Sequence, residues 1–319
     1  MNEPRPDLPV TVVYCDTGVE IPVVAQLVRR TLRGVAAEAR EAGLPLQVKV
    51  ATPRTEDSFF VKVIGRGYPP PTNKFRWCTD RLRIRPVQRM ITNLSEEGSV
   101  VVLGVRKGES TERDRTLSHF ETERPFVFRQ DGYPSSLVFA PVVNYTTEEI
   151  WETVMFMPDP VSLEGRRLWS LYGQSAGEEC PLIRDPNGSP CSRGRFGCWT
   201  CTVVRKDQGV AGLIEAGHEH LVPLLEFRDW LQTMRDEPEN RCPRRRNGAA
   251  GPGPLTLEAR RSALRRLRVA ERRSGLNLIK VREVELIHRL WREDRMSVNY
   301  QAIEKRGRNI RTATAKSRL

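Results

Sequence analysis

The densest group of reactive side chains lies in the stretch PCSRGRFGCWTC, residues 190–201, which contains three cysteines. Cys198 and Cys201 form a C-x-x-C pair, and Cys191 precedes that pair by seven residues. Thiolates at such spacing bind either a structural Zn²⁺ or an iron–sulfur cluster. A zinc ribbon usually has two C-x-x-C knuckles, whereas this stretch has one. The glycines beside the cysteines expose backbone amides, which can donate hydrogen bonds to the sulfides of a cluster. The residues favour a cluster and leave zinc or unliganded thiols open.

Two further cysteines are candidates for a fourth ligand. Cys180 lies closest to the first three along the chain, so local spacing favours it. Cys78 lies in KFRWCTDRLRIRP, residues 74–86, among four arginines. Guanidinium groups lower the pKa of a nearby thiol and favour the thiolate that a metal needs. A metal bound at Cys78 would lie beside groups suited to binding anions.

Three stretches have the composition of anion-binding loops: DTGVEIP (16–22), the arginine-rich 74–86, and LGVRKGESTERDR (103–115). A tight turn before a helix presents amides to phosphate, and guanidinium forks bind phosphate or sulfate through two hydrogen bonds. Each stretch alone is equally compatible with a capped helix start or a basic surface helix. The candidate nucleotide- or anion-binding residues are Asp16, Thr17, Gly18, Arg76, Arg81, Arg83, Arg106 and Lys107.

The elements that must position these residues alternate between strands and helices in the first half of the chain. Hydrophobic patterns predict strands at 10–15, 44–52, 99–105 and 136–143, separated by helices, including helices at 57–65 and 78–94. Such alternation predicts an α/β core with a mostly parallel sheet, whose ligands bind at the carboxyl ends of strands.

The pattern becomes helical from about residue 165. Two helices extend to about residue 235, a linker rich in Pro, Gly and Arg covers 241–255, and helices follow at 256–274 and 280–294. We therefore predict an α/β core at 1–164, a helical region containing the cysteines at 165–240, and a basic helical region at 241–319.

Positive charge is concentrated at the end of the chain. The formal net charge is +12, but residues 241–319 contain 22 Lys and Arg against 7 Asp and Glu, while residues 1–240 are close to neutral. A basic region of this kind fits nucleic acid, directly or through partners, although a solvated helical surface would look the same. No apolar run is long enough to span a membrane and no secretory leader is visible, so we expect a cytoplasmic protein.

In chain order, the three loops resemble motifs of the phosphoadenosine phosphosulfate reductase family, a branch of the PP-loop ATP pyrophosphatases. DTGVEIP resembles D-T-G-x-E-x-P, RWCTDRLRIRP resembles R-x-C-x-x-x-L-K-x-x-P, and LGVRKGES resembles G-x-R-x-x-E-S. The likeness continues through ECPLI, RFGCWTCTVV, LLEFRDWL and GPLTLEARRSALRRL. This extension is similar to the DndC-type sulfurtransferases of bacterial DNA phosphorothioation and covers about residues 10–295.

The resemblance implies an adenine nucleotide α-hydrolase-like core, a 4Fe-4S cluster, ATP with magnesium, and an enzyme that places sulfur on the DNA backbone. It also implies a cysteine desulfurase and other DNA phosphorothioation proteins as partners. Related adenylylsulfate reductases place cluster cysteines at the arginine-rich motif, which favours Cys78 as a ligand. We expect Cys78, Cys191, Cys198 and Cys201 to hold the cluster, with Cys180 as the alternative to Cys78.

One family motif does not occur in this sequence. The PP-loop S-G-G-x-D-S is expected before DTGVEIP, so a first strand and its phosphate-binding loop are missing. A misassigned start, a PP-loop on another chain, or a copy that no longer hydrolyses ATP would each explain this. Two functional alternatives follow: a non-catalytic subunit that binds DNA or partners, and a phosphoadenylylsulfate or adenylylsulfate reductase. The reductase needs a cysteine near the C-terminus, and TATAKSRL has none.

Overall fold

The computed structural model describes residues 8–94, 99–109, 111–129, 137–157, 160–176, 196–298 and 300–303. The chain forms two compact units, and each unit is built from separate segments of the sequence. The first unit consists of Met1–Tyr14, Val23–Ala51 and Val87–Arg195, and the second of Cys15–Pro22, Thr52–Pro86 and Phe196–Leu319. This division differs from the three consecutive domains predicted at 1–164, 165–240 and 241–319, because residues 52–86 pack with the C-terminal helices.

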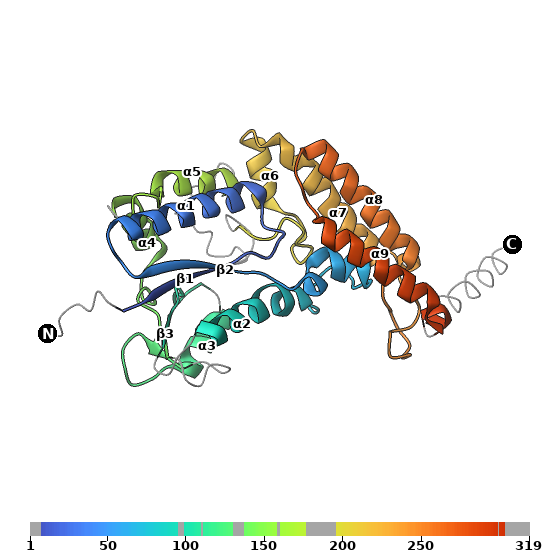
Figure 1. Cartoon of the computed structure of the whole chain (residues 1–319), viewed down its shortest axis with the longest axis horizontal. Coiled ribbons are helices and arrows are strands. Elements are labelled where there is room, and N and C mark those ends of the chain that lie inside the picture. The colour runs from blue at the N-terminus through green and yellow to red at the C-terminus, as the bar shows by residue number, and fades with distance from the viewer. Residues whose placement is uncertain are drawn as a thin grey trace. The chain divides into compact units, whose positions relative to one another are not determined.

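The first unit contains two small sheets and the helices around them (Figure 1). Its elements are β1 (Val10–Cys15), α1 (Pro22–Glu41), β2 (Leu46–Ala51), α2 (Arg85–Leu94), β3 (Val100–Val102), α3 (Thr111–Phe120), β4 (Val127–Phe128), β5 (Leu137–Phe139), α4 (Thr147–Phe156) and α5 (Gly165–Ala176). Cys15, Pro22 and residues 85–86, at the ends of β1, α1 and α2, belong to the second unit.

The sheets agree in part with the predicted parallel α/β core. β1 neighbours β2 in one sheet, and β3, β5 and β4 follow one another in the other. β3 pairs with β5 in parallel, with Val100 opposite Leu137. β4 pairs with β5 antiparallel and was not predicted, because two residues are too few to show a period of two. The described chain is therefore α/β with a small parallel pairing.

Two helices of the first unit begin as their sequences predict. Thr146 caps α4: its hydroxyl accepts from the Glu149 amide at 3.1 Å, and the Glu149 carboxylate accepts from the Thr146 amide at 2.7 Å. This reciprocal pair is a capping box, which the T-x-x-E spacing of the sequence allows. α5 begins at Gly165, where a Cβ would lie 2.3 Å from the Val154 carbonyl oxygen. Glycine at this position allows the start of α5 to approach the end of α4.

The second unit consists of helices and short helical turns. Its elements are η1 (Thr55–Asp57), η2 (Val61–Gly65), η3 (Thr79–Ile84), α6 (Gln208–Glu215), η4 (Glu219–Leu221), α7 (Val222–Asp236), η5 (Pro238–Asn240), α8 (Leu257–Ser274) and α9 (Val281–Met296). α7 and α8 lie side by side (Figure 1). The helices predicted at 57–65 and 78–94 exist, but η2 and η3 are π-helical turns. The α-helix α2 begins at Arg85, and Pro86 fits its first turn because a proline has no N–H and this turn requires none.

The core of the second unit joins its early and late segments. The Trp291 indole of α9 donates to the Ile64 carbonyl oxygen of η2 at 2.8 Å. Gly65 follows directly, and a Cβ there would lie 2.9 Å from Leu290, so glycine lets α9 approach η2. Within the described residues, no helix is both long and apolar enough to cross a membrane.

The stretch 241–255, predicted to be a linker, is folded. Arg241 bridges Leu255 and Arg244 bridges Ala250, which makes a short hairpin before α8. A Cβ on Gly253 would lie 1.9 Å from the Arg244 carbonyl oxygen, so the two arms meet where glycine leaves room. Composition predicted a linker because the Pro, Gly and Arg of a tight hairpin resemble those of a flexible connection.

Candidate functional site

The turn after β1 orients Thr17. Gly18 has a φ of 78°, which suits glycine, and its amide donates to the Asp16 carboxylate at 2.8 Å. Thr17 is buried, and its hydroxyl donates to Glu20 Oε1 at 2.8 Å. Asp16 and Gly18, both predicted as anion-binding residues, thus form the turn that fixes Thr17.

The C-x-x-C segment, residues 198–201, lies against this turn within the second unit. Glu20 forms a β-bridge with Cys198, and the Trp199 amide donates to the Val19 carbonyl oxygen at 3.0 Å. Thr17 Oγ1 lies 3.5 Å from Cys198 Sγ. The structure therefore brings together two predicted site residues that are 181 positions apart in the sequence.

The arginine-rich motif contributes the third side of the site. Burial raises the pKa of Cys78, which immediately precedes η3, and the nearby Cys201 raises it further. The sequence predicts that arginines lower this pKa, but burial dominates, and the charge of Arg83 acts instead to lower the pKa of Cys198. Burial acts to lower the pKa of Arg83, but Cys198 and Glu20 raise it above the ordinary value.

The electrostatic surroundings keep the Cys198 thiol protonated. Burial raises its pKa to about 12, and Glu20 adds to the increase while Arg83 opposes it. Burial likewise raises the pKa of Glu20. A metal binding at Cys198 must displace the thiol proton, because only the thiolate is a ligand.

The other predicted arginines of this motif have protein partners. Arg81 forms an ion pair with Asp57 at 3.3 Å, and Lys62 approaches the same carboxylate at 2.8 Å. Burial acts to raise the pKa of Asp57, but these two cations hold it below its ordinary value. Arg76 is exposed and donates to Asn73 at 2.9 Å. Arg83 is thus the predicted arginine that reaches the cysteines.

Arg106 and Lys107 belong to the first unit, where both contact protein groups. The Arg106 guanidinium donates to the Tyr145 carbonyl oxygen at 3.0 Å and to the Thr147 hydroxyl at 3.2 Å. These bonds attach the loop after β3 to the start of α4. Lys107 is more exposed and pairs with Glu121 at 3.7 Å.

Aromatic side chains lie beside the cysteines of the second unit. Trp199, between the two cysteines of the C-x-x-C pair, is buried, and its ring centroid lies 6.0 Å from Phe60 and 5.9 Å from Phe227. Trp77, immediately before Cys78, stacks on Phe59 at 5.8 Å. These rings pack beside the residues that carry the thiols, and burial raises the pKa values of Cys78 and Cys198.

The cysteines fit a bound metal or cluster in donor chemistry. Among the described residues, no three His, Cys, Asp or Glu side chains form a ready metal-binding group. The Thr200 hydroxyl oxygen, inside the C-x-x-C pair, is buried and has no hydrogen-bond partner in the part of the chain described. A sulfide or thiolate acceptor beside the cysteines would satisfy it.

Two other predicted ligands, Cys180 and Cys191, lie outside the described residues. Cys15 ends β1, and its thiol donates to the Leu82 carbonyl oxygen at 3.3 Å. Of the four predicted cluster ligands, Cys78, Cys198 and Cys201 lie in one unit, and Cys198 contacts the Thr17 turn.

Sequence reasoning missed the acidic and structural partners of this site. Glu20, Thr200 and Arg228 were part of quoted motifs but received no role, and Asp57 gave no local signal. Only three-dimensional contacts identify a buried hydroxyl or an arginine that binds main-chain carbonyls.

Comparison with known proteins adds no name to this geometry. No family model matches the chain, and no curated protein matches it. The case for a function therefore rests on the motifs and on the contacts between them.

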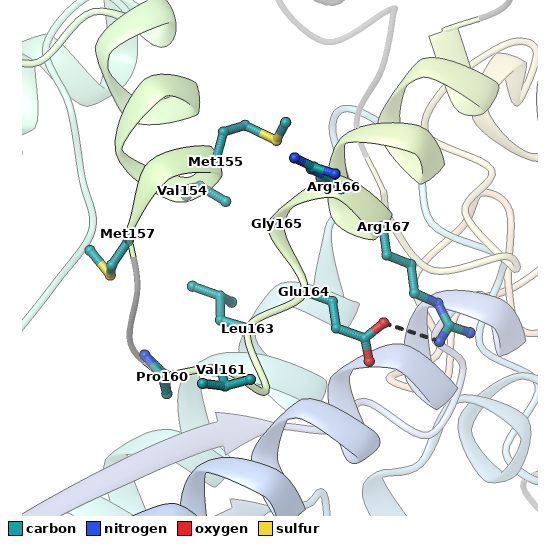
Figure 2. A pocket seen from close by; sticks show the side chains of 10 residues that line it. All are labelled: Val154, Met155, Met157, Pro160, Val161, Leu163, Glu164, Gly165, Arg166 and Arg167. Carbon is teal, nitrogen blue, oxygen red and sulfur yellow. Dashed lines mark hydrogen bonds and ion pairs between the residues drawn. The ribbon is translucent and has the colours of Figure 1, made fainter.

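The first unit also contains a pocket of about 400 Å³ between the end of α4 and the start of α5 (Figure 2). Its lining combines apolar side chains with charged ones at one side; it comprises Val154, Met155, Met157, Pro160, Val161, Leu163, Glu164, Gly165, Arg166 and Arg167. No predicted site residue lines this pocket.

Proposed function

We propose that this protein is an iron–sulfur sulfurtransferase of the DNA phosphorothioation type, with an adenine nucleotide α-hydrolase-like core. One observation carries the proposal: segments from the DTGVEIP, RWCTDRLRIRP and GCWTC motifs meet around Cys198. The Thr17 hydroxyl lies 3.5 Å from its sulfur, the charge of Arg83 acts to lower its pKa, and Cys201 is near enough to raise the pKa of Cys78. Resemblance of separate motifs is more persuasive when the fold places them together.

The residues around Cys198 suit chemistry on an anionic substrate. Arg83 supplies a fixed positive charge at the thiol, and exposed Arg76 lies on the same motif. In the proposed function these arginines orient a phosphate-bearing substrate. The Thr17 hydroxyl and the Glu20 carboxyl, 2.8 Å apart, hold a proton beside Cys198.

The proposed cofactor is a 4Fe-4S cluster held by Cys78, Cys191, Cys198 and Cys201, with Cys180 as the alternative to Cys78. When bound, such a cluster supplies one-electron redox chemistry. The Thr200 hydroxyl is available to donate to it. ATP with magnesium is the proposed activating cosubstrate.

The proposed DNA contact lies on α8. Arg261, Arg265, Arg268 and Arg272 recur at intervals of three or four residues, so they form one face of the helix, here named the α8 stripe. The buried residues Ala263, Leu267 and Ala270 lie on the opposite side. The α8 stripe spans about 16 Å, which suits several phosphates of one DNA strand. A cysteine desulfurase and other phosphorothioation proteins are the proposed partners, in the cytoplasm.

Anaerobic purification and metal analysis test the cluster. We expect brown protein with about four iron atoms and comparable sulfide per chain. Cys198→Ser, Cys201→Ser and Cys78→Ser should each lower the iron content, while Cys180→Ser should not. Cys242→Ser is the matched control, because Cys242 is buried beside Tyr300 and Ile303 in another cluster of the same unit. Colourless, zinc-loaded wild-type protein would contradict the proposal.

A non-catalytic subunit that binds DNA or partners through the α8 stripe is the second candidate. Release of pyrophosphate from ATP distinguishes the two functions. The enzyme should release pyrophosphate with DNA and a persulfide donor present, and Arg83→Ala should slow that release. If the protein contains the cluster but releases no pyrophosphate, either alone or with its partners, the result would favour the non-catalytic subunit.

A further inference from the structure

Two arginines of α7 bond the backbone that follows the C-x-x-C pair. Arg228 and Arg235 are seven residues apart, so both point from the same side of the helix. Both guanidinium groups donate to main-chain carbonyls of residues 201–205, here named the cysteine loop. This stretch contains no helix or strand, so its backbone needs other hydrogen-bond partners.

Arg228 is wholly buried and reaches three carbonyl oxygens of the cysteine loop. Its Nε donates to Cys201 at 2.8 Å, its Nη1 to Arg205 at 3.2 Å, and its Nη2 to Val204. Nη1 also forms an ion pair with Asp229 at 2.6 Å. One side chain thus fixes both ends of the cysteine loop, including the ligand residue Cys201.

Arg235 holds the middle of the loop. Its Nη1 donates to the Thr202 carbonyl oxygen at 3.0 Å and to the Pro71 carbonyl oxygen at 2.9 Å. The Thr202 hydroxyl donates to the same Pro71 oxygen at 2.8 Å. The cysteine loop is therefore attached to the segment that leads into the motif containing Cys78.

We infer that Arg228 and Arg235 form a carbonyl clamp whose role is to hold the Cys198 and Cys201 sulfurs in position to bind metal. They are positioning residues, because they bond the loop backbone and not the ligand sulfurs. Several carbonyls around one guanidinium need its planar fork, which lysine lacks. The inference rests on the proposed metal centre and assigns it a support that the motifs did not indicate.

Arg260 provides a matched comparison within the same unit. It is also wholly buried, and it donates to the Gly65 carbonyl oxygen at 2.5 Å, to Asp294 at 2.8 Å and to the Tyr300 hydroxyl at 2.8 Å. These partners lie outside the cysteine loop. Replacing Arg260 therefore removes a buried guanidinium network without removing the clamp.

Binding of Co²⁺ to the full-length, reduced, metal-free protein tests the clamp without an activity assay. Thiolate ligation of Co²⁺ gives a charge-transfer absorption band that reports bound sulfur directly. We expect Arg228→Lys and Arg235→Lys to weaken Co²⁺ binding by about 10- to 100-fold, as loss of outer-shell support does elsewhere. Arg260→Lys should lower the melting temperature and leave Co²⁺ affinity and the absorption band unchanged.

Wild-type Co²⁺ affinity in folded Arg228→Lys and Arg235→Lys proteins would overturn the clamp. So would a loss of affinity in Arg260→Lys equal to theirs, because the arginines would then act only through general stability. If Arg228→Lys does not fold, Arg235→Lys decides the question, since Arg235 is less buried. If wild-type protein shows no thiolate–Co²⁺ band, the proposed metal centre fails, and the clamp fails with it.

Discussion

At the residue scale, Thr200 has the side chain that the described protein contacts explain least. Its hydroxyl oxygen is buried and finds no partner there, although it lies between two cysteines. A buried hydroxyl without a hydrogen bond costs about 1–3 kcal/mol of folding free energy. This cost disappears when a bound group supplies a hydrogen-bond acceptor for the Thr200 hydroxyl.

Replacing Thr200 with valine should have opposite effects in the two forms of the protein. In metal-free protein, Thr200→Val should leave the free energy of unfolding unchanged or raise it by about 1 kcal/mol, because the unpaired hydroxyl is gone. In metal-loaded protein, it should lower stability or metal affinity. Denaturant titration of both forms measures the difference.

Thr202→Val is the matched control for Thr200. Thr202 is equally buried, but its hydroxyl donates to Pro71 at 2.8 Å. Thr202→Val should lower the free energy of unfolding by about 1 kcal/mol in both the metal-free and the metal-loaded form, because an existing hydrogen bond is lost. If Thr200→Val destabilises the metal-free protein as much as Thr202→Val does, Thr200 has no role toward a bound group.

At the element scale, the α8 stripe differs from the other arginines of the same helix. Arg261 and Arg272 have no ion-pair partner among the described side chains. Arg266 instead lies over the Trp230 ring at 4.8 Å, and Arg273 pairs with Glu226. Within the stripe, Arg265 pairs with Glu258 at 2.9 Å and Arg268 with Glu271 at 2.5 Å. The helix thus has one side whose arginines contact α7 and another, the α8 stripe, on which two of the four arginines pair within the helix.

Neutralising the two kinds of arginine separately tests DNA binding by the α8 stripe. The double variant Arg261→Gln/Arg272→Gln should weaken binding to duplex DNA and reduce the slope of log affinity against log salt by about two. Arg266→Gln/Arg273→Gln removes the same charge and should change the slope less. Equal effects of the two double variants on DNA affinity would indicate that only net charge matters. If the protein binds RNA or an acidic protein more tightly than duplex DNA, the α8 stripe is a binding surface for that partner instead.

Long periodic elements were predictable from the sequence, and short or tightly constrained ones were not. β1, α1, β2, α8 and α9 lie where their hydrophobic periods predicted, because each buries one face over several turns or residues. β4 is too short for a period, and the 241–255 hairpin depends on close backbone contact at Gly253. The grouping of Cys78, Cys198 and Thr17 was foreseeable from motif resemblance, but Arg228 and Thr200 were not, because their roles depend on the fold alone.

At the scale of the whole molecule, the second unit is assembled from three separate stretches of chain. Residues 15–22 and 52–86 supply the Thr17 turn, the arginine-rich motif and the η2 core, and residues from 196 onward supply the cysteine loop and α6–α9. Bonds such as Trp291 to Ile64 connect them. No single half of the sequence contains this core.

Cutting the chain at residue 195 should therefore prevent the C-terminal half from folding alone. A 196–319 fragment should unfold without a cooperative transition, because it lacks Phe59, Phe60 and Ile64, all buried in the intact chain. Co-expression with residues 1–195 should restore cooperative unfolding, as followed by circular dichroism. A sharp thermal transition in the isolated fragment would show that the helices form an independent domain, as the sequence had suggested.

The same assembly affects how the protein is made. Because 110 positions separate Pro86 from Phe196, the early segments of the second unit leave the ribosome well before their partners. At about 5–20 residues per second, the delay is roughly 6 to 22 seconds. During that interval Phe59, Phe60 and Ile64 have no late helices to cover them, so the nascent chain is exposed to aggregation or chaperone capture. Changes in translation speed between residues 87 and 195 should therefore alter the yield of folded protein without altering its sequence.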